Sequence, residues 1–208
     1  MTIALIALST VLGLGLWTLL EYGLHRFAMH HRPGRDLISR EHLVHHGDPA
    51  ATSAVMRTLG HLGVASLAAL GGYAASFLIA PAAAAGLAGG VAAGYSGYEL
   101  LHWHAHHRAP RTAYGVRLRH RHFQHHFGSP RANYGVTCRI WDRVFGSDDP
   151  SSTVVVPRRM AMAWLCDDGG EIRPAHRSGY EIRSGRPATA EVVAEDRGRA
   201  FADEPPLP

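Results

Sequence analysis

Lysine is absent from this 208-residue chain, and all 21 of its basic residues are arginine. Cysteine is scarce as well, because the chain has only Cys138 and Cys166, and they form no C-x-x-C pair. A disulfide framework or a zinc ribbon needs more cysteines at closer spacing, so both classes are excluded. The sequence also lacks a G-x-G-x-x-G loop at a strand-to-helix junction and a C-x-x-C-H motif. It therefore has no recognisable site for a dinucleotide or a c-type haem.

Charge is missing from two long stretches of the chain. Residues 2–20 carry no charged side chain, and residues 58–98 contain no Asp, Glu, Arg or Lys. A helix needs ~20 apolar residues to cross a bilayer core. Pro81 divides the second stretch into parts of about 23 and about 17 residues, which predicts a two-helix hairpin with the proline near its turn. We therefore expect three membrane-crossing helices.

Two details refine this prediction. A cleaved signal peptide is the alternative for residues 2–20, but the basic n-region and the A-x-A cleavage site that such a peptide carries are missing. A retained membrane helix is therefore favoured. Gly86, Gly90 and Gly94 recur every four positions and so lie on one helix face, which predicts close packing against another helix.

The arginines predict the orientation in the membrane. They are absent from residues 1–25 and 58–107, and they gather in residues 26–57 and 108–121. The positive-inside rule places both arginine-rich segments in the cytoplasm, with the N-terminus outside. Because the arginines follow membrane topology, nucleic-acid binding is not expected despite the basic composition. The usage of Ala, Gly and Arg is typical of a GC-rich bacterial genome, so a bacterial inner membrane is the expected location.

The last part of the chain differs in character. Residues 150–208 are rich in Pro, Gly, Ser, Arg and acidic residues, with one short apolar run at residues 154–156. We expect a cytoplasmic tail here, partly disordered, with a small strand pair. Residues 1–149 are then the membrane-embedded domain. The predicted fold class is an all-α, integral membrane helical bundle with a histidine-rich cap on its cytoplasmic face.

Histidine is the residue that the chain has in excess. Twelve of its 16 histidines fall in four boxes, and ten of these form two H-x-x-H-H triples and two pairs, His25 with His30 and His102 with His106. An α-helix turns ~100° per residue, so positions i, i+3 and i+4 share one face. The boxes read H-R-F-A-M-H at 25–30, H-L-V-H-H at 42–46, H-W-H-A-H-H at 102–107 and H-F-Q-H-H at 122–126. In the first box the two outer histidines are five positions apart, so one of them must lie near a helix end or a bend.

Together the two triples and the two pairs offer ten imidazoles, which suit two metal ions of four to six ligands each. Imidazole ligates Fe, Zn, Cu and Ni, so ligand type alone leaves the metal open. Glu99 lies three residues before His102 on the same helix face, where a carboxylate would orient a ligating imidazole. The alternative for Glu99 is a simple membrane-boundary residue. The ten candidate ligands are His25, His30, His42, His45, His46, His102, His106, His122, His125 and His126.

With these boxes in place, the chain resembles the membrane fatty acid hydroxylase and sterol desaturase superfamily over roughly residues 17–146. Besides the boxes, the resemblance rests on E-Y-G-L-H-R-F at 21–27, Y-E-L-L-H at 98–102 and N-Y-G-V-T-C-R-I-W-D-R-V-F-G at 133–146. It implies a dimetal centre at the cytoplasmic face, ligated by the ten box histidines. His107 is a further candidate there, as an alternative ligand or as a neighbour that orients one.

The resemblance implies O₂-dependent hydroxylation or desaturation of a lipid, such as a fatty acyl chain, a sphingolipid or a sterol. This reaction favours two iron ions, with zinc as another occupant in the isolated protein. Electrons must come from a separate ferredoxin, cytochrome or reductase. Carotenoid ring hydroxylases and lipid desaturases of the same superfamily remain alternatives, and a metal-handling membrane protein is the alternative outside the enzymes. The chain departs from many relatives in having three expected crossings instead of four.

Overall fold

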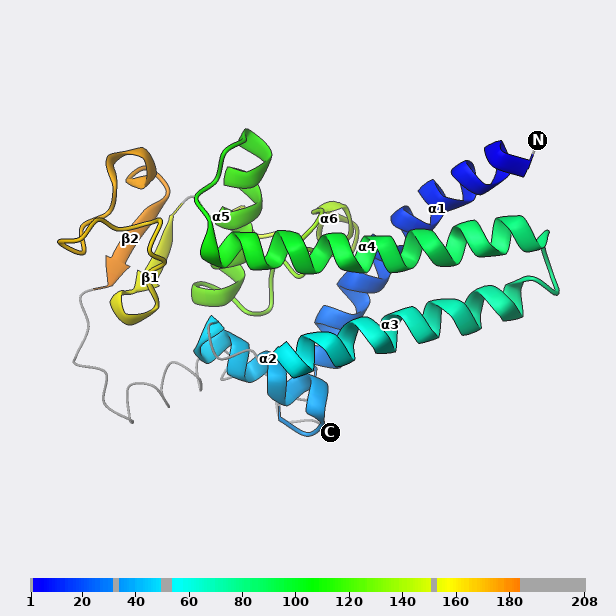
Figure 1. Cartoon of the computed structure of the whole chain (residues 1–208). Coiled ribbons are helices and arrows are strands. Elements are labelled where there is room, and N and C mark those ends of the chain that lie inside the picture. Colours follow the sequence, from blue (N-terminus) through cyan, green and yellow to red (C-terminus); the bar gives the residue numbers. More distant parts are fainter. Residues whose placement is uncertain (1, 32–33, 50–53, 151–152, 184–208) are drawn as a thin grey trace.

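The computed structural model describes residues 2–31, 34–49, 54–150 and 153–183, and these are mostly helical (Figure 1). The three longest helices run side by side and extend away from the shorter elements that follow them. The elements are α1 (Thr2–Gly23), the π-helical η1 (Leu24–His30), α2 (Leu37–Gly47), α3 (Ala54–Ala75), α4 (Pro81–His107), α5 (Ala113–Phe127), α6 (Ile140–Val144), β1 (Val154–Pro157), the 3₁₀ turns η3 (Arg158–Met160) and η4 (Pro174–His176), and β2 (Tyr180–Arg183).

The predicted hairpin is confirmed, because α3 and α4 pack along each other and α4 begins at Pro81. Proline is favoured at the first helical position, where its missing N–H has no intrahelical acceptor anyway. Two helical stretches, Thr2–His30 and Ala54–Ala75, are long and apolar enough to cross a membrane. The Ala- and Gly-rich α4 is not one of them, so the third crossing stays a prediction.

Glycines allow α1 and α4 to approach very closely. A Cβ atom built on Gly90 would lie 2.2 Å from the carbonyl oxygen of Thr10, and one on Gly86 would lie 2.1 Å from the Ser9 hydroxyl. On the α1 side, a Cβ atom on Gly13 would lie 2.2 Å from the Leu87 carbonyl oxygen. The predicted small-residue stripe is therefore confirmed, and α1 is the helix that packs against it.

The segment with the first box continues from α1 as a π-helix. Its i to i+5 hydrogen-bonding pattern brings residues five apart onto one side, which suits His25 and His30. The predicted helix end is also present, because η1 ends at His30. Beyond it, Asp36 directly precedes α2, and its carboxylate accepts a hydrogen bond from the Ser39 N–H and so caps the helix.

Residues 153–183 add a feature that the all-α prediction does not contain. β1 and β2 form a two-stranded parallel sheet, so the expected strand pair is present. Val154, Val156 and Leu165 are fully buried in the same apolar cluster as Phe123 of α5. This part of the expected tail is therefore folded onto the helices. Residues 184–208, for which disorder is predicted in part, lie outside the described residues.

Gly90→Ala should lower the stability of the chain, because its new methyl group meets the α1 backbone. Overpacking of this kind costs about 1–3 kcal/mol. The matched control is Gly89→Ala, since a Cβ atom there meets nothing within 4 Å, and alanine is the better helix former by roughly 0.5–1 kcal/mol. Thermal unfolding in detergent measures both variants. Equal unfolding midpoints for the two would contradict the packing described for α1 and α4.

Candidate metal centre

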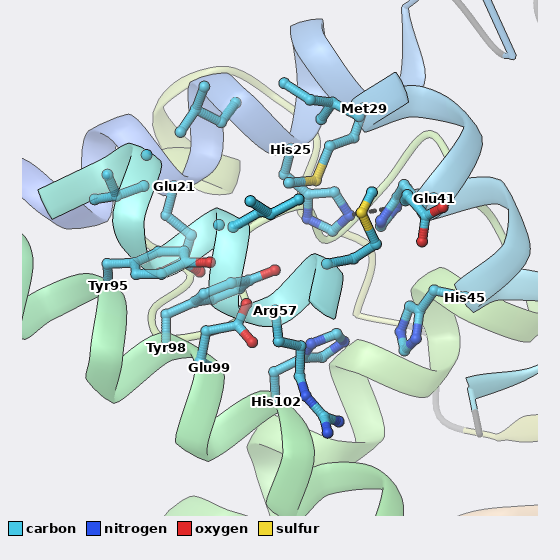
Figure 2. Close-up of a pocket in the computed structure, with 18 of the residues that line it drawn as sticks. Glu21, His25, Met29, Glu41, His45, Arg57, Tyr95, Tyr98, Glu99 and His102 are labelled. Carbon is cyan, nitrogen blue, oxygen red and sulfur yellow. Dashed lines mark hydrogen bonds between the residues drawn. The ribbon is translucent and has the colours of Figure 1, made fainter. Parts of the chain in front are cut away.

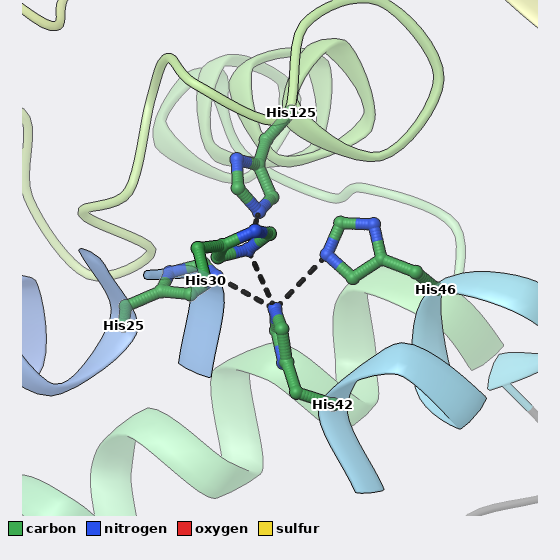
Figure 3. A group of neighbouring side chains, drawn as sticks. All are labelled: His25, His30, His42, His46 and His125. Carbon is green, nitrogen blue, oxygen red and sulfur yellow. Dashed lines mark hydrogen bonds between the residues drawn. The ribbon is translucent and has the colours of Figure 1, made fainter. Parts of the chain in front are cut away.

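The ten box histidines gather into two groups of five, and within each group the candidate ligand atoms all lie within 4.8 Å of one another. Nine of the ten side chains are buried, and His102 is half-buried. Group I is His25, His30, His42, His46 and His125 (Figure 3). Group II is His45, His102, His106, His122 and His126.

In group I the imidazoles converge through their Nε2 atoms. The Nε2 of His42 lies 2.8 Å from that of His30, 3.0 Å from that of His46 and 3.1 Å from that of His25. The His30 and His125 Nε2 atoms are 3.0 Å apart. These side chains come from η1, α2 and α5, and Figure 3 shows them pointing toward one common point.

Group II has the same character and adjoins group I. The Nε2 atoms of His122 and His106 lie 2.8 Å apart. The His45 ring lies 4.5 Å from the ring of His102 and 4.8 Å from that of His106, measured between centroids. The two groups meet where the His46 and His126 rings stack 4.1 Å apart with 9° between their planes.

Each H-x-x-H-H box serves both groups. In the 42–46 box, His42 and His46 belong to group I and His45 belongs to group II. In the 122–126 box, His125 belongs to group I, and the other two histidines belong to group II. Neighbouring histidines at i+3 and i+4 diverge by ~100° around the helix, so one short helix reaches both groups. The box spacing predicts the shared face but does not predict this division.

Two backbone carbonyls fix the protonation of two imidazoles of group I. The Nδ1 of His25 lies 2.5 Å from the Tyr134 carbonyl oxygen, and the Nδ1 of His125 lies 2.7 Å from that of Ala132. A carbonyl only accepts, so each Nδ1 must carry the proton. The Nε2 lone pair is then free to bind a metal, which is the usual arrangement for a ligating histidine.

The N-Y-G and W-D residues hold these carbonyls in place. The buried Asp142 carboxylate accepts hydrogen bonds from the backbone N–H groups of Tyr134 and Gly135, at 2.8 and 2.9 Å. Asn133 adopts a positive φ of 58°, and its side chain bonds the backbone of Asp149 at both ends. A Cβ atom on Gly135 would lie 2.1 Å from the Cys138 carbonyl oxygen, so glycine is required there.

Burial keeps the histidines of α2 and α5 neutral. It is the largest cause of a pKa well below the ordinary value of 6.5 for each of them, and neighbouring imidazoles lower the pKa further. A neutral imidazole has the lone pair that a metal needs. These histidines are His42, His45, His46, His122, His125 and His126.

The donor set fits metal ions. Both ring nitrogens of His126 are buried and have no hydrogen-bond partner among the described residues. A buried polar atom without a partner costs about 1–3 kcal/mol, and a metal ion at the centre of group II would supply the missing partner. Five converging neutral imidazoles in each group suit borderline ions such as iron or zinc.

The remaining predicted residues lie outside both groups. The Glu99 carboxylate accepts a hydrogen bond from the Tyr95 hydroxyl and lies near Arg57 and His61. His107 is exposed, and its ring stacks on Trp103. The other histidines outside the groups are His31, His61, His104, His120 and His176.

A cavity of about 460 Å³ opens onto both groups. Figure 2 shows His25 on one side and His45 and His102 on another, with Glu99 and Arg57 beside His102. Most of the other lining side chains are apolar and come from α1, η1, α2 and α3. They include Leu24, Met29, Leu37, Ile38, Met56, Leu59, Val64 and Leu67. The cavity can therefore hold an apolar molecule beside the histidines.

Several residues beside the two histidine groups have contacts that the sequence does not predict. Tyr98 is buried, and its ring stacks on His102 with 5.6 Å between centroids. The Glu21 carboxylate is buried and accepts hydrogen bonds from the backbone and the hydroxyl of Thr137. Glu21, Tyr98 and Asp142 all fall within quoted motifs. The motifs thus locate these residues, but only the folded chain gives their contacts.

The fold and the two histidine groups define a helical protein with a candidate dinuclear metal centre beside an apolar cavity. The chain belongs to the fatty acid hydroxylase family, whose model matches residues 10–147.

Several characterised relatives are similar over the same part of the chain. The dihydroceramide fatty acyl 2-hydroxylase FAH2 of Arabidopsis thaliana is 30% identical over 161 residues, which cover 71% of this chain and 63% of the relative. The ceramide very long chain fatty acid hydroxylase scs7 of Schizosaccharomyces pombe is 33% identical over 67% of this chain and 42% of the relative. The fatty acid 2-hydroxylase of Homo sapiens is 32% identical over 67% of this chain.

A solved structure is similar as well. It is full-length scs7p with only the hydroxylase domain visible, and it matches with a TM-score of 0.54 at 27% identity over 69% of this chain and 56% of that one. The chain thus spans less than two thirds of the length of each of these relatives.

The purified protein should contain about two metal ions per chain, one for each group of five imidazoles. His125→Ala should reduce the content of group I, and His122→Ala that of group II, so each variant should retain about one ion. The control is His104→Ala, whose histidine lies outside both groups. Elemental analysis of protein purified in detergent gives the counts. A wild-type count near one that survives His122→Ala unchanged would refute a dinuclear centre.

The metal-free protein should lose stability as the pH falls through about 6.5. The unfolded chain gains protons on its histidines there, whereas the buried histidines of α2 and α5, with their lowered pKa, stay neutral. Each such histidine lowers the free energy of unfolding by up to about 1.4 kcal/mol per pH unit. Denaturant unfolding between about pH 7.5 and about pH 5.5 measures the loss. Bound zinc should raise the stability across this range and leave the decline in place, because the protons are taken up by the unfolded chain. A constant stability in the metal-free protein would contradict the prediction.

Proposed function

We propose that this protein is a membrane-bound, O₂-dependent di-iron hydroxylase that acts on a C–H bond of a long-chain lipid. The observation that carries the proposal is the apolar cavity that reaches both histidine groups at once. A cavity of this kind suits an acyl chain, because removing the apolar surfaces of the chain and of the cavity walls from water is energetically favourable. The relatives named above act on fatty acyl groups of ceramides and on fatty acids, which favours the same substrate class here.

In this proposal the ten box histidines hold two iron ions, five imidazoles to each. Iron bound there would supply the activation of O₂ for attack on an unactivated C–H bond. The protein's own residues prepare the site for it. The Tyr134 and Ala132 carbonyls hold the Nδ1 protons of His25 and His125, and burial keeps the imidazoles neutral. The apolar lining excludes water from the substrate and places its chain beside both groups.

Glu99 and His107 have positioning roles in this proposal. Glu99 shares a helix face with His102 and lines the cavity beside it. Its carboxylate would therefore help to orient the His102 imidazole of group II. His107 follows His106 directly and also lines the cavity.

In this proposal the protein lies in the membrane, so that the lipid substrate reaches the cavity from the bilayer. Many large apolar side chains of α1 and α3 are exposed, among them Ile3, Leu8, Leu67 and Leu70, and none of the residues of α3 is buried. Such surfaces suit lipid contact. We propose three crossings with the histidine groups at the cytoplasmic face of a bacterial inner membrane. Two electrons per turnover then come from a separate ferredoxin, cytochrome or reductase.

Expression in a bacterial host with an intact electron donor should produce lipids with one added oxygen atom on an acyl chain. The oxygen should come from O₂, because hydroxylation transfers one of its atoms to carbon. Mass spectrometry of lipid extracts from cells grown under ¹⁸O₂ tests both points. His122→Ala is the control, and it should remove the new species because it breaks group II. Unchanged lipid profiles, with the metal-loaded protein present and its donor active, would refute the hydroxylase proposal.

A further inference from the structure

An exposed patch lies at the metal end of α4. Leu100, Trp103 and His107 are at positions i, i+3 and i+7, so they share one helix face. Leu100 is 56% exposed and Trp103 is 36% exposed, and His107 and Arg108 are also exposed. We call these four residues the α4 patch. Large apolar side chains at a polar surface often mark a contact with another molecule.

The α4 patch is ordered by contacts among its own side chains. The His107 ring stacks on the Trp103 ring at 4.8 Å with 10° between the planes. The Nδ1 of His107 lies 2.9 Å from the Trp103 carbonyl oxygen. The Arg108 guanidinium lies 5.6 Å from the centre of the Trp103 ring, within the range of a cation–π contact. The indole is therefore held in one orientation in the free protein.

The α4 patch is also close to group II. The ring centroids of His107 and His106 are 6.5 Å apart, and His106 is a member of that group. Trp103 and His107 additionally line the cavity that reaches both groups. A molecule that contacts the α4 patch would thus be separated from group II by little more than one imidazole ring.

The charge around the α4 patch is mostly positive, although Glu99 directly precedes the patch and Glu41 lines the same cavity. Residues 100–141 contain seven arginines and no Asp or Glu. Arg108, Arg111 and Arg117 are exposed in this segment. Such a surface attracts an acidic partner and accelerates its association. Encounters between electron-transfer proteins are small and transient, with less than about 1,200 Å² of buried surface, so a patch of this size with a charged border is sufficient.

We propose that the α4 patch is the docking surface of a small acidic one-electron carrier protein that reduces the metal centre through group II. The proposal rests on the proposed function, which requires such a carrier. Hydroxylation inserts one atom of O₂ into the C–H bond and reduces the other to water. It therefore consumes two electrons and two protons, and two carrier molecules each donate one electron while the protons come from solvent.

The test uses iron-loaded full-length protein in detergent and a plant-type [2Fe–2S] ferredoxin as the acidic probe. Arg108→Glu should weaken ferredoxin binding at low salt on the order of tenfold, and Arg108→Gln, which removes the charge without reversing it, should weaken it less. Trp103→Leu should slow the anaerobic oxidation of reduced ferredoxin.

The matched control is Arg173→Glu, which reverses the charge of an exposed arginine in residues 153–183. It should leave the ferredoxin affinity and the oxidation rate unchanged. Calorimetry gives the affinity, stopped-flow absorbance gives the rate, and metal content identifies variants that fail to fold.

Wild-type affinity and rate in metal-loaded Arg108→Glu and Trp103→Leu would overturn the proposal. It would also be overturned if these variants changed only the binding to phosphatidylglycerol vesicles, because the α4 patch would then face the lipid headgroups, where tryptophan is common. A different result would count against the proposed function. If the wild-type protein oxidises ferredoxin through the α4 patch but forms no hydroxylated lipid, the hydroxylase proposal fails and the docking surface stands.

Discussion

The convergence of imidazole nitrogens in a buried space is the constraint on which the rest of the structure depends. Within group I, Nε2 atoms lie 2.8–3.1 Å apart, and two lone pairs at this distance repel each other unless a proton or a metal ion lies between the nitrogens. Burying such atoms unpaired is costly, so the arrangement is stable only with a shared positive centre or with protons distributed among the rings. The scaffold accordingly has to be rigid. The glycine contacts between α1 and α4 provide this rigidity on one side, because they fix α4, which bears His102, against α1, which continues into the η1 segment that bears His25.

On the other side the loop between α5 and α6 provides rigidity through hydrogen bonds. Asp142 is fully buried, and besides the two backbone N–H groups it accepts hydrogen bonds from Ser147 and Arg121. The loop therefore presents its carbonyls to His25 and His125 in a fixed position. Hydrogen bonds to a carboxylate are the stronger, charge-assisted kind. The N-Y-G and W-D residues thus act on the metal centre through the backbone, and the Tyr134 ring also packs against the rings of His25, His30 and His125.

Periodicity and composition were sufficient for the helical hairpin, the glycine stripe and the ten histidines, because each of these leaves a repeat in the sequence. Three features left no such trace. The π-helical winding of η1 depends on where the His25 and His30 rings must point, and a spacing of five indicates only a departure from the α-helix. The division of each H-x-x-H-H box between two groups depends on how α2 and α5 cross. The packing of Val154 and Leu165 against Phe123 joins residues far apart in the chain, so local composition indicated a tail where the structure has part of the core.

The two groups are held in different ways, and this difference follows from their surroundings. Group I has two imidazoles fixed by backbone carbonyls. In group II the Nδ1 atoms of His122 and His126 have no hydrogen-bond partner among the described residues. Their orientation comes instead from packing, since Phe123 lies against His106 and His122, and Trp164 lies against Phe123. Trp164 also donates a hydrogen bond to the Ala105 carbonyl oxygen, which ties residues 153–183 to the helix that bears His106. The folded part of the C-terminal region therefore supports group II in the way that the loop between α5 and α6 supports group I.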